Sequence, residues 1–366
     1  MNNKKVYILG AGSSIGHSQG LFPSANDFFR KAKDLNIDIK NEYPQVVDYV
    51  QDKLGKDIST GKGATDIEDL FTYITIELEG NITPDLERIR RQLFVLIQRV
   101  LVHLERKVDI SVNNAYEEYV SFCSKIGKED TIITFNWDLL LDNILKRKEI
   151  LKNIYMNTNM GVSHPEHYNN FIMDISAIGE GTIKHMSMAY PHKEWKAETG
   201  YYLKAHGSID WFYCTNDKCR AFGKVFPSLD PEVTHFCSEC FEELSLLLIP
   251  PVLNKEYRKY PIIRKIWNLA KKEISVAGEL VIWGYSLPPT DFYSLWLLRQ
   301  ARQSIKKLTI INPFLLNTKG VLRTSIVKRF QNIYHKKIDN SNIFLYSSYK
   351  EYCENKKIFY NTIHNF

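Results

Sequence analysis

Two pairs of cysteines constrain the fold of this chain more than any other feature. Four residues separate Cys214 from Cys219, two separate Cys237 from Cys240, and seventeen lie between the pairs. This spacing is close to the pattern that closes a tetrahedral thiolate site around zinc. An all-cysteine set favours a closed structural site over a catalytic one, with His235 as an alternative ligand. We therefore expect structural zinc in a small ribbon module.

The remaining cysteines, Cys123 and Cys353, show no such spacing and are expected to be ordinary thiols. The chain opens with Met1 and a few polar residues, without a secretory signal, and runs directly into an apolar segment. We therefore expect a cytoplasmic protein, because a reducing compartment favours metal binding over disulfides. No apolar run approaches the ~18 residues that a membrane-spanning helix needs, so no membrane association is expected.

Composition sets ordinary limits on the possible functions. The 366 residues are 44% hydrophobic and carry 48 basic against 42 acidic side chains, a net charge of +6. Such a chain is long enough to bury one large core together with a smaller module. The basic residues are scattered, which is more typical of a solvated face than of a nucleic-acid site. The charge permits DNA as a partner without requiring it.

A glycine-rich turn follows the first apolar segment. Gly10, Ala11, Gly12 and Ser13 lie where a strand is expected to pass into a helix, a context in which backbone N–H groups approach a diphosphate. With Gly16 the pattern reads G-x-G-x-x-x-G, one residue longer than the dinucleotide fingerprint. No second strand ending in an acidic residue follows ~20 residues later. We therefore do not expect an ordinary hydride-transferring enzyme.

From about residue 40 to residue 125 the hydrophobic pattern is helical, with a period of about 3.6 residues. Thr83 followed by Pro84 is a typical helix start, an N-cap and then proline at the first helical position. Apolar residues then recur at helical spacing from Leu86 to Leu104. Such stripes are far more often core than cofactor site. We expect a helical insertion between two strands of a parallel sheet.

Later apolar segments also end in small polar residues. The segment 130–135 leads to Asn136 and Asp138, 280–283 to Gly284 and Ser286, and 308–311 to Asn312. Buried parallel strands read as continuous apolar runs, and ligand-binding groups gather beyond their carboxyl ends. Asn136 and Asp138 are equally typical of turns. His206, followed by Gly207, ends a further strand-like segment, where a titratable side chain is hard to explain as packing.

These patterns together predict an α/β fold, a Rossmann-like, doubly wound parallel sheet with a helical insertion and a small zinc-ribbon module. We assign the sheet domain to residues 1–39, 126–212 and 245–366. The insertion then comprises residues 40–125, and the zinc-ribbon module comprises residues 213–244.

The order and spacing of the motifs resemble those of the sirtuin family over most of the chain. Residues 10–13 resemble the family's opening G-A-G-x-S, residues 134–138 its T-Q-N-I-D and residues 204–207 its L-H-G. The four cysteines resemble its zinc ribbon. Residues 284–286 resemble its G-T-S loop, and residues 311–312 resemble its late I-N. The resemblance implies an NAD-binding fold in which His206 is the catalytic base. It implies that Asn136 orients the carboxamide or the attacking water.

The resemblance also implies roles for the remaining candidates. Gly10, Ala11, Gly12 and Ser13 would cradle the diphosphate, and Gly284, Ser286 and Asn312 would belong to the NAD site, the last two at the adenosine half. Asp138 either acts at the ribose or caps the next helix. Asn26 and Asp27 either line the ribose site or begin the helix that contains Phe28.

Two segments depart from the pattern of the protein deacylases in this family. Where a deacylase carries P-x-V-V-x-F-G-E, residues 248–255 read L-I-P-P-V-L-N-K, and residues 20–28 replace G-I-P-D-F-R without its arginine. Together with the helical insertion, these departures resemble the sirtuin-like domains of bacterial anti-phage systems. That resemblance implies an NAD⁺ hydrolase that depletes NAD in the infected cell, forms a homo-oligomer and pairs with a HerA-like ATPase.

The hydrolysis of NAD requires only a few catalytic side chains. Nicotinamide leaves as a neutral molecule from a cationic pyridinium, so its departure needs no general acid, unlike that of ordinary glycosides. One base such as His206 and good positioning by Asn136 therefore suffice. Two alternatives stay open, an NAD-dependent protein deacylase that uses the same two residues and a DNA-associated subunit of a defence complex.

Overall fold

The computed structural model of the chain describes residues 4–61, 65–110, 117–127, 129–146, 201–222, 225–227, 234–250, 260–288, 291–316, 322–334 and 338–358. The helices of this part are α1 (Ala11–His17), α2 (Phe28–Asp34), α3 (Ile39–Glu42), α4 (Pro44–Leu54), α5 (Ile67–Gly80), α6 (Pro84–Ile110), α7 (Glu117–Lys125), α8 (Leu140–Lys146), α12 (Pro261–Ser275), α13 (Phe292–Leu298), α14 (Thr324–Tyr334) and α15 (Tyr349–Cys353). Among these described helices, none combines the length and the apolar character needed to cross a membrane.

Six strands of the described residues form one parallel sheet in the order β3-β2-β1-β7-β8-β9. They are β1 (Lys5–Leu9), β2 (Thr131–Thr134), β3 (Tyr202–Lys204), β7 (Glu279–Trp283), β8 (Lys307–Ile311) and β9 (Ile343–Tyr346). The chain first adds β2 and β3 on one side of β1, and then adds β7, β8 and β9 on the other side, as in doubly wound folds. The predicted α/β class with a Rossmann-like sheet is confirmed.

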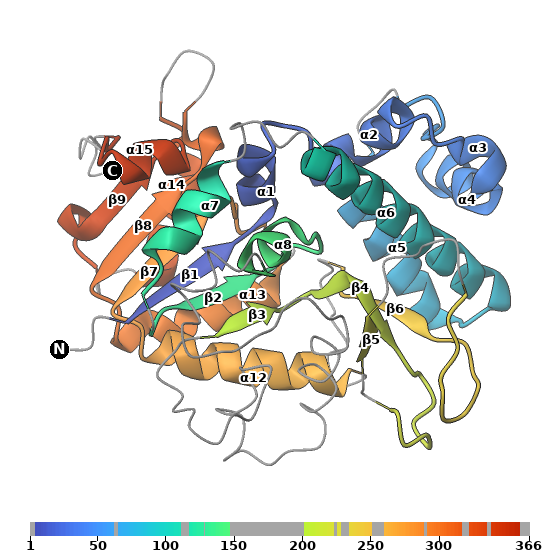
Figure 1. The fold of residues 1–366 in the computed structure, drawn as a ribbon. Coiled ribbons are helices and arrows are strands. Elements are labelled where there is room, and N and C mark those ends of the chain that lie inside the picture. Colours follow the sequence, from blue (N-terminus) through green and yellow to red (C-terminus); the bar gives the residue numbers. More distant parts are fainter. Residues whose placement is uncertain are drawn as a thin grey trace.

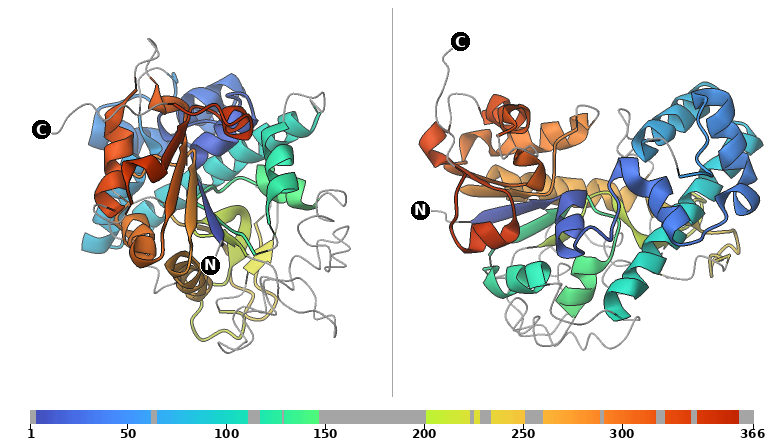
Figure 2. Two further views of the ribbon diagram at one scale, coloured as in Figure 1. Left: turned by 90° about the vertical axis from the view of Figure 1, so that its left-hand side faces the viewer. Right: turned by 90° about the horizontal axis from the view of Figure 1, so that it is seen from above.

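Helices cover both faces of this sheet (Figure 1, Figure 2). Successive residues of β1 enter different cores, because side chains alternate between the faces of a strand. Tyr7 packs edge-on against Phe122 of α7, with ring centroids 5.0 Å apart. Ile8 belongs to the opposite core, together with Ile263 of α12. The central strands are thus buried on both sides, which explains their continuous apolar sequences.

The helices α2 to α6 lie beyond the carboxyl ends of the strands, in the chain between β1 and β2 (Figure 1). The predicted start of α6 is confirmed, since the N–H of Leu86 donates to the Thr83 hydroxyl at 3.2 Å. The side chain of Gln98, on α6, donates to the carbonyl of Ile209 at 2.7 Å. This bond connects the helical insertion to a second, smaller sheet.

The smaller sheet is antiparallel, in the order β5-β4-β6. Its strands are β4 (Gly207–Tyr213), β5 (Val225–Pro227) and β6 (Ser245–Leu248). Strand β4 begins directly after His206 and ends directly before Cys214. One short strand therefore joins the candidate base to the first cysteine of the metal module.

Candidate functional site

A cavity of about 370 Å³ lies at the carboxyl ends of β1, β2, β7 and β8. Its volume is within the range of small-molecule sites. Most of the candidates named from the sequence line its wall, namely Gly10, Ala11, Gly12, Asn26, Asn136, Asp138, His206, Gly284, Ser286 and Asn312. The helical insertion closes the cavity on another side, through Ile67 and Glu68 of α5 and Leu101 of α6. The cavity lies at the point where the strand order reverses, which is where ligands bind in such sheets.

Ser13 and Asp27 do not belong to the cavity wall. The Ser13 hydroxyl donates to the Gly10 carbonyl at 2.8 Å and contacts the Tyr119 hydroxyl at 2.8 Å. Asp27 pairs with Arg30 at 2.8 Å, and this hydrogen bond lowers the pKa of the Asp27 carboxyl. Both residues are therefore engaged by other groups of the protein.

The glycine turn packs tightly against the loop after β7. A Cβ on Gly12 would lie 2.8 Å from the Gly284 backbone, and Gly284 itself has a φ of +66°. The N–H groups of Gly10 and Gly12 donate to the carbonyls of Trp283 and Gly284, and the N–H of Ser13 donates to that of Gly10. These glycines are thus required for loop packing, and several of the turn's amides already have protein partners. Diphosphate binding by this turn stays a prediction.

Asn136 is tied to this turn by its side chain. Its amide nitrogen donates to the Gly10 carbonyl at 3.1 Å and to the Ser14 hydroxyl at 3.0 Å. Its backbone N–H donates to the Thr134 hydroxyl at 3.1 Å. The residue is 8% exposed and lines the cavity. Its carboxamide is therefore held in one orientation, as a positioning group requires.

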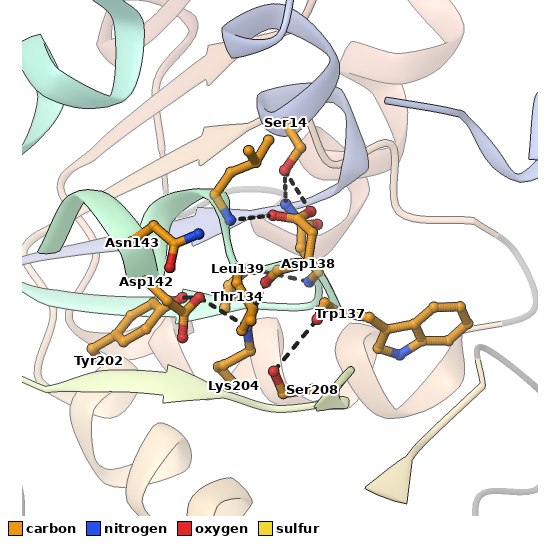
Figure 3. A network of polar contacts seen from close by, with 12 residues as sticks. Ser14, Thr134, Trp137, Asp138, Leu139, Asp142, Asn143, Tyr202, Lys204 and Ser208 are labelled. Carbon is orange, nitrogen blue, oxygen red and sulfur yellow. Dashed lines mark hydrogen bonds and ion pairs between the residues drawn. The ribbon is translucent and has the colours of Figure 1, made fainter. Parts of the chain in front are cut away.

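Asp138 has the contacts of a supporting residue. The Ser14 hydroxyl donates to one carboxylate oxygen at 2.7 Å, and the N–H of Leu140, the first residue of α8, donates to the other at 3.1 Å (Figure 3). Burial raises the pKa of the Asp138 carboxyl. The helix-capping alternative for Asp138 is thus present in the structure, and a direct role at a ribose stays a prediction.

Further buried charges surround Asp138. Lys204 donates to the Asp138 carbonyl at 2.6 Å and pairs with Asp142 at 2.9 Å, and Asp142 also accepts a bond of 2.8 Å from Tyr202 (Figure 3). Glu105, on α6, accepts hydrogen bonds from the N–H of Leu139 and from the Asn143 side chain. Burial, and next the charge of Asp138, raise the pKa of Glu105 well above its ordinary value. This network fixes the loop that carries Asn136.

His206 lies in the turn between β3 and β4 and is 3% exposed. Gly207 has a φ of +76°, and a Cβ there would meet the Leu247 carbonyl oxygen at 2.0 Å, so the turn requires glycine after the histidine. The imidazole packs against Phe135, with ring centroids 4.8 Å apart. Its Nε2 lies 4.0 Å from a carboxylate oxygen of Asp291.

Sequence reasoning missed two groups at the site. Asp291 precedes an apolar helical segment, so it reads as an N-cap, and it does cap α13 by accepting from the N–H of Ser294 at 3.1 Å. Tyr119 lies on α7, and its buried hydroxyl is within 2.8 Å of the Ser13 hydroxyl and 3.1 Å of the Ser14 hydroxyl. No local pattern connects a tyrosine at position 119 with a turn at position 10, because their proximity arises from tertiary packing.

The four cysteines of the ribbon converge as predicted. Their sulfurs all lie within 4.8 Å of one another, with Cys214 and Cys240 at 3.6 Å and Cys219 and Cys237 at 3.8 Å. A tetrahedron with Zn–S bonds of ~2.3 Å has sulfur separations of ~3.8 Å, so the set fits zinc. His235 instead packs its ring against Phe212 and is not part of the cluster found among the described residues.

Several solved structures resemble the chain at low identity. A Sir2 homologue in complex with 2′-O-acetyl-ADP-ribose is 12% identical, with 90% of each chain covered and a TM-score of 0.42. Sir2Tm bound to a propionylated peptide is 12% identical, with 96% of this chain and 92% of that chain covered and a TM-score of 0.33. SIR2 in complex with an inhibitor, 2′-O-acetyl-ADP-ribose and a deacetylated p53 peptide is 14% identical, with coverages of 96% and 91% and a TM-score of 0.34.

Neither a sequence profile of a known family nor a curated protein matches the chain. Because the identities are 12–14% and the TM-scores are below 0.5, these similarities carry no argument about the fold or the activity of this chain. The fold therefore rests on the strand order β3-β2-β1-β7-β8-β9 and on the four-cysteine cluster beside the small antiparallel sheet.

Proposed function

We propose that this chain is an NAD⁺ hydrolase that converts NAD⁺ and water into ADP-ribose, nicotinamide and a proton. The observation that carries the proposal is the convergence of Asn136 and His206 on one cavity at the switch point of a doubly wound sheet. Such a crevice is the usual nucleotide site of this architecture. The sirtuin-like order of motifs supports NAD as the nucleotide.

The charge of the cavity supports the same substrate. Asp66, Glu68, Asp138 and Asp291 line it, and no lysine or arginine of the described residues does. Carboxylates around the cavity favour a cationic pyridinium in the bound state and the positive charge that develops on the ribose as the glycosidic bond breaks. With no lysine or arginine among the described residues of this wall, the diphosphate of NAD would be held by backbone N–H groups.

In the proposed reaction, the bond between ribose C1′ and the nicotinamide nitrogen breaks, and its electron pair neutralises the pyridinium. The oxygen of water forms a new bond to C1′, and its proton passes to the imidazole of His206. Asn136 holds the carboxamide of the leaving group or the attacking water. Zinc at the four cysteines would stabilise the ribbon and the end of β4 that lies opposite His206. It would take no part in the reaction step.

We further propose, from the resemblance, that this activity serves bacterial anti-phage defence by NAD depletion, in a homo-oligomer that pairs with a HerA-like ATPase. The departure from the deacylase pattern supports hydrolysis without a peptide substrate. Part of the segment that departs from this pattern, residues 251–255, lies outside the described residues. The helical wall formed by α5 and α6 is consistent with a cavity that receives NAD alone.

The test is chromatography of purified protein incubated with NAD, with and without an acetyl-lysine peptide and a HerA-like ATPase. We expect nicotinamide and ADP-ribose without peptide, and a loss of at least ~100-fold in His206→Ala. The matched control is His103→Ala, a half-buried histidine of α6 that does not line the cavity. Peptide-dependent release with acyl transfer would make the protein a deacylase, and salt-sensitive DNA binding without any cleavage would make it a DNA-associated subunit.

A further inference from the structure

The chain places a second buried ionisable group beside His206, on an element that is distant in sequence. Asp291 is 1% exposed and His206 is 3% exposed. His206 Nε2 lies 4.0 Å from Asp291 Oδ2. Both residues line the cavity described above. A carboxylate at this distance from an imidazole is within the range in which it favours the protonated ring.

The carboxylate of Asp291 is itself held in place by three donors. The hydroxyls of Tyr285 and Ser294 donate to Oδ2 at 2.9 and 2.6 Å, and the N–H of Ser294 donates to Oδ1 at 3.1 Å. Hydrogen bonds of this kind favour the ionised form of a carboxyl group. The Asp291 carboxylate is thus fixed in position by its donors.

Aromatic rings enclose the pair. The ring of Phe135 packs against both neighbouring rings, with its centroid 4.8 Å from that of His206 and 4.7 Å from that of Tyr285. The ring of Trp267 stacks on the imidazole at 6.2 Å, and its indole N–H donates to the Ala205 carbonyl at 2.8 Å. Apolar surroundings lower the local dielectric and strengthen the interaction between the two groups.

We propose that Asp291 is a positioning residue for His206, whose charge, 4.0 Å from Nε2, orients the imidazole and stabilises the imidazolium that forms when a ring nitrogen accepts the proton. The role rests on the proposed hydrolysis of NAD, but the pairing itself does not. The proton moves from water to the imidazole, and Asp291 stays ionised throughout. Its negative charge then compensates the new positive charge.

Other acidic groups face the same cavity and belong in the account of the charge around His206. Asp66 and Glu68 contribute from the start of α5, and Asp138 contributes from the loop after β2. Asp291 is the group of this set whose carboxylate contacts the imidazole, at 4.0 Å from Nε2. The substitution Asp291→Asn removes its charge, keeps its size and retains a good helix N-cap.

The first test is a titration of the histidine ring signals by NMR in the full chain without NAD. The His206 signals are assigned by their loss in His206→Ala. We expect the midpoint of their titration to fall by about one pH unit in Asp291→Asn, because the imidazolium loses its partner. Asp38→Asn, the same change at an exposed N-cap of α3, is expected to leave the midpoint unchanged. An unchanged midpoint in Asp291→Asn overturns the pairing, whether or not the wild type cleaves NAD.

The second test measures NAD cleavage as a function of pH. We expect kcat of Asp291→Asn to fall about 100-fold at neutral pH while KM changes less than about threefold. The acid limb of the profile moves to lower pH, because His206 must be neutral to accept a proton. A change in KM alone would contradict the positioning role. If Asp291→Asn does not fold, Asp291→Ser keeps an N-cap without the charge, and the same shifts are expected.

Discussion

At the scale of single residues, the cavity depends on side chains that are fixed before any ligand arrives. The amide nitrogen of Asn136 donates to the Gly10 carbonyl and to the Ser14 hydroxyl, so the residue bridges the turns after β2 and β1. The same Ser14 hydroxyl donates to Asp138. Preorganisation of this kind avoids the cost of ordering a side chain during the reaction.

We expect Asn136→Ala to lower kcat for NAD cleavage about 100-fold, because the nicotinamide or the water loses its orienting group. The thermal unfolding midpoint should fall by only a few degrees, because the lost buried hydrogen bonds are worth about 1–3 kcal/mol. Asn41→Ala, at an exposed asparagine of α3, provides the control. Steady-state kinetics with both variants measures the effect, and full activity in Asn136→Ala would exclude the residue from the mechanism.

At the scale of elements, β3, α6 and α8 meet at one buried charge network. Lys204 of β3 is the basic member, and two of the carboxylates are Asp138 and Asp142 (Figure 3). The third carboxyl group is that of Glu105. Burial raises the pKa of Glu105 well above its ordinary value. The folded chain therefore keeps a proton at this residue to a higher pH than the unfolded chain does.

This linkage predicts a pH dependence of stability. Above the unfolded pKa of about 4.3, the free energy of unfolding should decrease as pH rises towards the raised folded pKa, by up to ~1.4 kcal/mol per pH unit for one proton. Glu105→Gln imitates the protonated acid and should flatten this slope. Urea unfolding between about pH 5 and pH 8 measures it, with Glu87→Gln at an exposed position of α6 as control. Equal slopes in wild type and Glu105→Gln would contradict the assignment.

At the scale of the whole molecule, strand order brings distant segments together. Residues near positions 10, 136, 206, 284 and 312 line one cavity because five parallel strands, β1, β2, β3, β7 and β8, end at the same edge. Strand β4 then runs from His206 to Cys214 and so connects this cavity to the thiolate cluster. The metal module is therefore a support for the turn that holds the candidate base.

We expect one zinc per chain, bound by the four cysteines. Cys240→Ser should lose this zinc and with it a contribution on the order of 10 kcal/mol to the folding of the ribbon. Cys353→Ser, outside the cluster, should retain it. Elemental analysis of protein purified without chelator, together with thermal unfolding, measures both effects. Absence of zinc from the wild type would exclude a structural metal.

Much of the fold could be predicted from the sequence, because its signals are local. Continuous apolar runs predicted β1, β2, β7 and β8, Thr83 and Pro84 predicted the start of α6, and cysteine spacing predicted the cluster. The contacts of the site were harder to predict. Asp291 reads only as a helix cap, and its distance of 4.0 Å from His206 depends on the tertiary packing that brings the start of α13 to the turn between β3 and β4. The glycines at positions 12 and 284 read as ligand-binding residues, whereas their close contact arises from the pairing of two loops.

The contact between Gly12 and Gly284 also bears on how the protein is made. A ribosome releases the first strand long before the strand that ends at position 284, yet the cavity needs both loops in contact. Domains fold during synthesis only as far as their emerged segments allow. A nascent chain from which residue 284 has not yet emerged therefore has no complete cavity. Whatever chemistry the cavity performs is withheld until the segment that carries Gly284 has been made and has packed against the first turn.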